Sequence, residues 1–187
     1  MAKVLFNPVM EQIRGKIGDL VFRRTSGGMA VMRKTEPAET EPTPAQQQAR
    51  ERFRLAAAYA AAVAADPARV ALYAPFVNRT RSLRVAAMTD YLTPPEVLAV
   101  ETGAYDGAVG DPIVVRAVDD GAVVEVRLTL RDGAGAVLEQ GVATAAAGLW
   151  TYAATTAVAA GTVVAVEAVA TDRPGNTGRK TVTVTLP

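Results

Sequence analysis

The chain has 187 residues, half of them apolar, a formal net charge of +1, and neither cysteine nor histidine. The absence of both residue types excludes disulfides, thiol nucleophiles, thiolate or imidazole zinc sites and histidine general bases. Residues 1–92 carry a net charge of +6 and residues 93–187 a net charge of −5. The length suits one domain or two small ones, and opposite charges on the two halves are compatible with head-to-tail attraction between subunits.

The first elements that we expect are a strand at residues 2–6, an arm at residues 9–14 and a β-hairpin. The hairpin strands, residues 20–25 and 29–34, flank Ser26-Gly27-Gly28, whose glycines tolerate the positive φ of tight turns. An isolated two-stranded hairpin is only marginally stable in water. We therefore expect this one to pack on something else.

A helix start follows the hairpin. Thr43 is a good N-cap, Pro44 suits the first helical position, and Gln46 completes a capping box. The sequence predicts a helix from Pro44 to about Ala65, ended by an Asp-Pro pair. Its first half is amphipathic and its second half is apolar on nearly all sides. We interpret the second half as a buried core helix, with a subunit interface as the alternative.

The run RGKIGDLVFRR, a glycine turn, a proline-rich spacer and PTPAQ…RERF resemble a family of small proteins encoded in phages and prophages. The matching positions are Gly15, Lys16, Gly18, Val21, Phe22, Arg23, Gly28, Arg33, Pro42, Thr43, Pro44, Ala45, Gln46, Arg50 and Phe53. This resemblance covers the first half of the chain and implies a particle-associated, structural setting without a mechanism. Glu36, Glu39 and Glu41 depart from the family spacer, which weakens a nucleic-acid role.

Two shorter helices are expected, one at residues 67–73 with Pro67 at its start and an amphipathic one at residues 82–92. Around them the sequence places six arginines: Arg50, Arg52, Arg54, Arg79, Arg81 and Arg84. These side chains form either a phosphate-facing patch or a solvated helix face paired with Glu51. We favour the solvated face, since the aromatic residues that stack on bases are lacking.

After Thr93-Pro94-Pro95 the apolar period changes from helical to two. We expect seven strands, at residues 97–102, 112–118, 122–131, 136–140, 149–154, 162–171 and 179–186. Their number and spacing predict a β-sandwich. The predicted division is a hairpin-plus-helices assembly domain at 1–93 and a sandwich domain at 94–187. The fold class is thus an α+β N-terminal region followed by an all-β sandwich.

The second half resembles bacterial immunoglobulin-like modules. The resemblance rests on Gly148-Leu149-Trp150-Thr151-Tyr152 and on the closing run of residues 169–184, which contains Asp172, Gly175 and Asn176. With no cysteine pair, Trp150 is expected to pack on aliphatic side chains. The resemblance implies an immunoglobulin-like fold and a spacer, adhesion or assembly role.

No motif predicts catalysis or cofactor binding. The loop carboxylates Asp106, Asp111, Asp119, Asp120, Asp132 and Asp172 are candidate calcium ligands. However, no D-x-D-x-D-G loop organises them, and aspartates in turns usually bond their own backbone. Ser26 and Ser82 have no histidine to activate them, and GKIG lacks the spacing of a phosphate loop. We therefore expect no catalytic residue, no cofactor, no metal and no enzymatic activity.

The resulting functional prediction is a non-enzymatic structural component of a phage or phage-like particle, assembled in the bacterial cytoplasm. Its partners are other copies of itself or other particle subunits, with no membrane and no small-molecule substrate. No secretion signal is apparent, and the apolar run at residues 55–65 is too short to span a bilayer. The alternatives are a nucleic-acid-binding accessory protein that uses the basic half and a surface adhesin. The predicted interface residues are Gly15, Lys16, Gly18, Phe22, Arg23, Arg24, Gly28, Arg33, Pro44 and Phe53.

Overall fold

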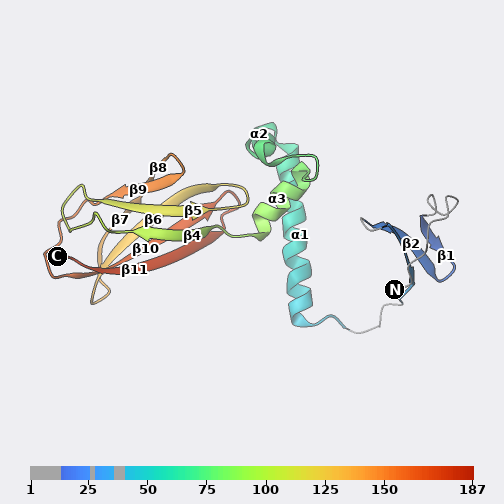
Figure 1. The fold of residues 1–187 in the computed structure, drawn as a ribbon, viewed down its shortest axis with the longest axis horizontal. Coiled ribbons are helices and arrows are strands. Elements are labelled where there is room, and N and C mark those ends of the chain that lie inside the picture. The colour runs from blue at the N-terminus through green and yellow to red at the C-terminus, as the bar shows by residue number, and fades with distance from the viewer. Residues whose placement is uncertain (1–13, 26–27, 36–40) are drawn as a thin grey trace. The chain divides into compact units, whose positions relative to one another are not determined.

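The computed structural model describes residues 14–25, 28–35 and 41–187. The chain forms two compact units, Met1–Thr43 and Pro44–Pro187. The first contains a small sheet, and the second contains the helices and the sandwich (Figure 1). The change from helix to strand falls at residues 93–95, as expected, whereas the division between compact units lies earlier, between Thr43 and Pro44.

The first unit holds a three-stranded antiparallel sheet in the order β1-β2-β3, formed by Gly15–Ile17, Leu20–Thr25 and Gly28–Arg33. The predicted hairpin is therefore confirmed as β2 and β3, and β1 is an additional strand. The prediction that Gly28 belongs to the turn is wrong, because Gly28 pairs with Thr25 as the first residue of β3. The expected strand at residues 2–6 and most of the arm before Gly15 lie outside the described residues.

The helices begin and end close to the expected positions. They are α1 Pro44–Ala65, α2 Pro67–Tyr73, the short 3-10 helix η2 Ala74–Phe76 and α3 Leu83–Leu92. Local capping explains two of the starts: Asp66 accepts a hydrogen bond from the Ala68 amide at 2.9 Å, and Ser82 accepts one from the Val85 amide at 3.3 Å.

The helices α2 and α3 lie beside the upper part of α1 (Figure 1), and together the three enclose a small core. Its fully buried members are Ala60, Val63, Tyr73, Ala86 and Ala87. Because most of these side chains are small, the backbones of α1 and α3 can approach closely. The second half of α1 is buried only along the stripe of Ala56, Ala60 and Val63, and most of its other apolar residues are exposed, so the prediction of a buried core helix holds for that stripe alone.

The remaining strands form two four-stranded antiparallel sheets that pack as a β-sandwich. One sheet has the order β11-β10-β6-β7, from Thr177–Thr185, Val163–Asp172, Val123–Asp132 and Val137–Val142. The other has the order β4-β5-β9-β8, from Glu96–Glu101, Pro112–Val118, Leu149–Ala153 and Thr144–Ala146. All seven expected strands are present, and β8 is an eighth.

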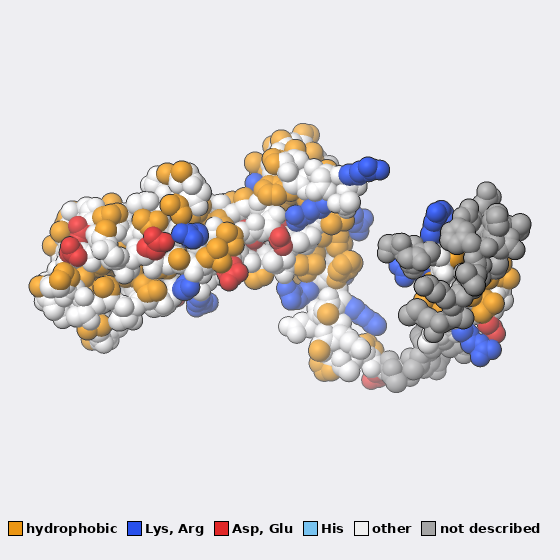
Figure 2. Space-filling view, in the orientation of Figure 1, with side chains coloured by type: hydrophobic (Ala, Val, Ile, Leu, Met, Phe, Trp, Pro, Cys, Tyr) orange, Lys and Arg blue, Asp and Glu red, His pale blue; other side chains and the backbone are white. Residues whose placement is uncertain are grey.

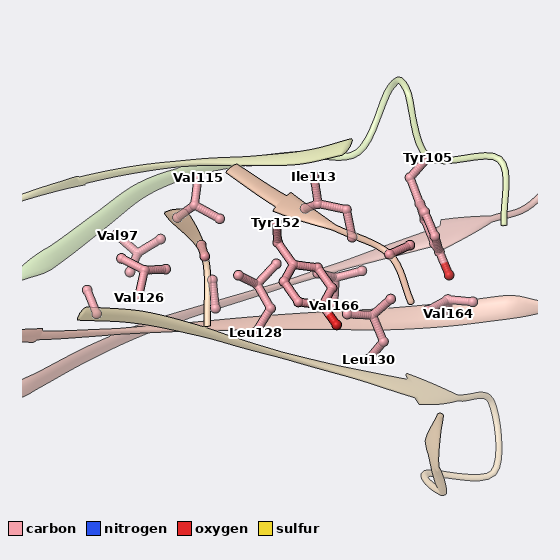
Figure 3. Close-up of a cluster of buried hydrophobic side chains, with 14 of the residues drawn as sticks. Val97, Tyr105, Ile113, Val115, Val126, Leu128, Leu130, Tyr152, Val164 and Val166 are labelled. Atoms are coloured by element: carbon pink, nitrogen blue, oxygen red, sulfur yellow. The ribbon is translucent and has the colours of Figure 1, made fainter. Parts of the chain in front are cut away.

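The sandwich core consists of inward-facing residues from both sheets (Figure 3). The strands β6 and β10 contribute alternating buried side chains because strand side chains point to opposite faces in turn. Ile113 and Tyr152 of the other sheet lie across from them. Trp150 is half-buried and packs against this aliphatic core, as expected in the absence of cysteine.

One charged side chain is buried at the edge of this core. Glu139 of β7 accepts hydrogen bonds through Oε2 from the Tyr152 hydroxyl at 3.1 Å, and from the amides of Thr155 and Thr156 at 2.7 and 3.1 Å. The carboxylate therefore fixes the segment after β9 to the opposite sheet. These contacts give Glu139 a structural role in the sandwich.

Candidate functional site

The sheet of the first unit gathers apolar side chains on one face. Residues directly opposite each other in an antiparallel sheet share a face, and alternate residues of one strand do so too. The pairings place five apolar side chains on one face: Ile17, Leu20, Phe22, Met29 and Val31. We call this set the β1–β3 apolar face. Among residues 14–24 and 29–35, whose exposure the structure describes, none is buried.

The predicted basic contact residues of the sheet divide between its two faces. Arg24 lies opposite Met29 and Arg33 lies opposite Leu20, so both share the β1–β3 apolar face. Arg23 lies opposite Ala30, and Lys16 lies opposite Val21, on the other face. The structure therefore does not bring the three predicted arginines into one cluster.

Two of the predicted interface residues, Gly15 and Gly18, are glycines at the start of β1 and just after its end. Gly15 and Gly18 have φ angles of +107° and +59°, a region that favours glycine. A Cβ at either position would meet no atom within 4 Å. Their role is therefore conformational, while the predicted interface residue Gly28 lies within β3.

The beginning of α1 forms a second exposed surface. All residues from 44 to 55 are exposed, including the predicted contacts Pro44 and Phe53. We call residues 44–55 the leading segment of α1. The Phe53 side chain is 58% exposed, although it lies on the stripe that is buried from Ala56 onward. Figure 2 shows apolar side chains at the surface along α1, next to arginines.

Three of the six arginines around the helices have partners within the chain. The guanidinium of Arg52 donates a hydrogen bond to the carbonyl of Leu92, the last residue of α3, at 3.1 Å. Arg54 pairs with Glu51 at 2.6 Å, which confirms the predicted solvated pairing for this arginine. Arg81 donates to the carbonyl of Asp120 at 3.4 Å. These three arginines therefore make contacts within the chain.

A third feature is a group of aspartates where α3 meets the sandwich. Asp90 lies on the last turn of α3 and is fully buried. The Tyr73 hydroxyl donates a short hydrogen bond to Asp90 Oδ2, and it lies 2.8 Å from the Tyr59 hydroxyl. Burial raises the pKa of Tyr73, which keeps this hydroxyl protonated. The helices thus hold Asp90 in one orientation.

Two loops of the sandwich bring the other carboxylates. Asp119, after β5, accepts a hydrogen bond from the Gly121 amide at 2.7 Å. Asp172, at the end of β10, accepts bonds from the amides of Gly175 and Asn176 at 2.8 and 2.6 Å. One carboxylate oxygen from each of the three aspartates lies within 4.8 Å of the others. We call Asp90, Asp119 and Asp172 the three-aspartate cluster.

The Asn176 side chain joins the loop after β10 to the end of α3. Its Nδ2 donates to the carbonyls of Asp90 and Tyr91, both at 3.2 Å, and to Asp172 Oδ2 at 2.7 Å. Arg173, beside Asp172, lies over the rings of Tyr73 and Phe76, 5.2 and 5.3 Å from their centroids. The position of α3 against the sandwich is therefore fixed by several polar contacts.

The electrostatics of the cluster are unfavourable for three ionised groups. Burial raises the pKa of Asp90 to about 7; the Tyr73 hydrogen bond opposes this effect, and neighbouring Asp119 adds to it. Burial also raises the pKa of Asp172, against the lowering effect of its bonds to Asn176 and Gly175. A proton shared between two carboxylates, or a bound cation, would reduce the repulsion between these groups.

Sequence reasoning identified Asp119 and Asp172 only as separate loop carboxylates and missed Asp90. Their backbone bonds follow the expected pattern for turns, which Asp111 and Asp132 also show. The prediction did not bring any two of these loops together. Asp90 carries no local signal, because an aspartate in a helix with apolar neighbours is ordinary in sequence. Only the packing of α3 on the sandwich reveals the cluster.

Comparisons with known proteins do not place the chain in a family. No protein-family model and no curated protein matches it. Among solved structures, CopC from Methylosinus trichosporium OB3b is 18% identical with a TM-score of 0.35, and the match covers 48% of this chain and 89% of CopC. An engineered protein is 26% identical with a TM-score of 0.35, over 49% of this chain and 20% of that protein.

A conjugate transposon protein from Bacteroides vulgatus is 14% identical with a TM-score of 0.25, over 48% of this chain and 80% of its own. These similarities are too low to identify a function for this chain. Among the described residues, no single helix is long and apolar enough to cross a membrane. The segment Pro44–Ala65 with Pro67–Phe76 meets that test only as a pair bent by 110°.

Proposed function

We propose that the chain is a non-enzymatic assembly protein that binds neighbouring subunits through the β1–β3 apolar face and the leading segment of α1. The observation that carries the proposal is the exposure of large apolar side chains in both places, with Ile17 and Phe53 each 58% exposed. A three-stranded sheet with one apolar face gains stability when that face is packed against another surface. Both surfaces contain residues that the sequence marked as contacts, namely Phe22, Arg24, Arg33, Pro44 and Phe53.

The leading segment of α1 supports the same reading. The apolar stripe of α1 runs without a break from exposed Phe53 to buried Ala56, Ala60 and Val63. An amphipathic helix places such a stripe against a partner along its whole length. Among the described residues the stripe is buried only from Ala56 onward, so the exposed first three turns are suited to a neighbouring subunit.

The sandwich acts in this proposal as a spacer or bracing module. Its resemblance to bacterial immunoglobulin-like modules and its well-packed core suit a rigid part that carries mechanical load. The sequence resemblance of the first half to phage and prophage proteins suggests the setting, a phage or phage-like particle assembled in the bacterial cytoplasm. The proposed partners are further copies of the chain or other subunits of that particle.

The test is the mass of the full-length protein in solution, measured by light scattering and sedimentation over a wide range of concentration. We expect assemblies larger than the monomer, and we expect Phe53→Lys to shift them toward the monomer. Val109→Lys is the matched control, because Val109 is 65% exposed but lies on the sandwich. A strict monomer at every concentration, with no companion protein in its native setting, contradicts the proposal.

The charge of the sheet segment, residues 14–35, favours one second candidate, a nucleic-acid-binding accessory protein. Residues 14–35 contain six basic side chains and one acidic side chain. This function predicts binding to labelled DNA that weakens steeply as salt rises. Arg24→Ala with Arg33→Ala should abolish that binding, while Arg23→Ala, on the other face, should reduce it less. The absence of measurable DNA binding at low salt excludes this candidate.

A further inference from the structure

We propose that the three-aspartate cluster binds a calcium ion that joins helix α3 to the β-sandwich. The carboxylates come from three separate segments, which are the last turn of α3, the loop between β5 and β6, and the end of β10. One oxygen from each lies within 4.8 Å of the others. Calcium binds oxygen ligands at 2.3–2.6 Å, so two oxygens on one ion are separated by at most about 5 Å.

A second observation points to a ligand in this place. Asp90 is 0% exposed, and its Oδ1 is buried without a hydrogen-bond partner. This oxygen lies directly over Gly121, in the loop that carries Asp119; a Cβ on Gly121 would collide with the Asp90 carboxylate. Asp119 also has an unpaired buried oxygen, Oδ1. Two carboxylate oxygens are both acceptors, so they need a bridging group between them.

The other oxygens of the cluster are held from outside. Tyr73 donates to Asp90 Oδ2, the Gly121 amide donates to Asp119 Oδ2, and Asn176 donates to both oxygens of Asp172. Outer hydrogen bonds of this kind orient the carboxylates that ligate a metal. The unpaired oxygens of Asp90 and Asp119 are the ones left for the ion.

No basic side chain neutralises the cluster within the part of the chain that the structure describes. The ion pairs found there join other residues, and none includes Asp90, Asp119 or Asp172. The nearby Arg173 lies over the rings of Tyr73 and Phe76, and Arg81 donates to the carbonyl of Asp120. A divalent cation supplies the missing positive charge.

Calcium fits this site better than magnesium. Three carboxylates, two of them buried, suit the flexible coordination of calcium. Magnesium requires near-ideal octahedral geometry at 2.0–2.1 Å, which oxygens held by three separate segments do not readily provide. Thiolate and imidazole ligands, which softer metals prefer, are absent from the sequence.

The experiment uses the full-length chain, freed of metal with a chelator and titrated with calcium chloride by calorimetry. We expect one binding event per chain and a rise in melting temperature, with a much smaller rise for magnesium. Terbium should also show luminescence sensitised by excitation of tyrosine, because Tyr73 contacts Asp90. Asp90→Asn and Asp119→Asn should remove the calcium response.

Asp120→Asn is the matched control, because the side chain of this exposed neighbour of Asp119 lies outside the cluster. It removes the same formal charge as Asp90→Asn or Asp119→Asn. Circular dichroism verifies that each variant is folded, and any unfolded variant is replaced by Asp172→Asn. The proposal is overturned by a folded wild type without heat or melting shift at saturating calcium. It is also overturned by an equal response to magnesium, or by equal loss in Asp120→Asn.

Discussion

The contact between Tyr73 and Asp90 gives the sharpest test of how the helices hold the cluster. Tyr73→Phe removes one hydroxyl and leaves the buried ring in place, so the packing of the helix core is unchanged. The lost group donates to Asp90 Oδ2 and lies 2.8 Å from the Tyr59 hydroxyl. A hydrogen bond to a charged group contributes about 1.5–3 kcal/mol, so we expect the free energy of unfolding to fall by about 2 kcal/mol.

The assay is urea denaturation of the metal-free protein well above pH 7, where Asp90 is ionised, followed by circular dichroism, with Tyr59→Phe as the control. That control keeps the bond to Asp90 and should cost about 1 kcal/mol or less, the value for an ordinary neutral hydrogen bond. In an Asp90→Asn background, Tyr73→Phe should also become less costly, because the charge is gone. Equal losses for Tyr73→Phe and Tyr59→Phe, or no coupling to Asp90→Asn, would show that the Tyr73 hydroxyl does not stabilise an ionised Asp90.

Two further predictions concern buried carboxylates. The pKa of Asp90 rises from the usual 3.8 to about 7 in the folded chain, so the protonated form stabilises the fold below pH 4. In metal-free protein the free energy of unfolding should therefore fall as the pH rises from about 4 to about 7. Urea denaturation at several pH values in this range should show a smaller change for Asp90→Asn than for the wild type. In the sandwich, Glu139→Ala strands the buried hydroxyl of Tyr152 and should cost about 3 kcal/mol in urea. Glu139→Gln keeps an acceptor and should cost less; equal losses would contradict this account.

Local chemistry made much of the fold predictable. Pro44, Pro67 and the Asp66 cap define the helix starts, and period-two alternation identifies the long strands β6 and β10. Two short strands, β1 and β8, were not predicted, and each case has a physical reason. β1 has only three residues, too few to show a pattern.

The strand β8 was not predicted because of the turn that joins it to β9. This turn consists of Ala147 and Gly148, which have φ angles of +50° and +80°. Such a turn usually carries asparagine or aspartate before glycine, so Ala-Gly gives a weak signal. The exposure of Phe53 was partly predictable, since it lies between Arg52 and Arg54. The three-aspartate cluster was not predictable, because it depends on how α3 packs against two distant loops.

The amide of Asn176 has a mechanical consequence. A pull on α1 reaches the sandwich along the backbone through residues 93–95 into β4, which is an edge strand of its sheet. By itself that route would peel β4 away from β5 one hydrogen bond at a time. Asn176, which lies between β10 and β11, donates hydrogen bonds to the carbonyls of Asp90 and Tyr91. Part of the force therefore passes into β10 and β11 instead. The long β10 pairs on both sides, so the strain is spread over the broader sheet before the edge strand begins to tear.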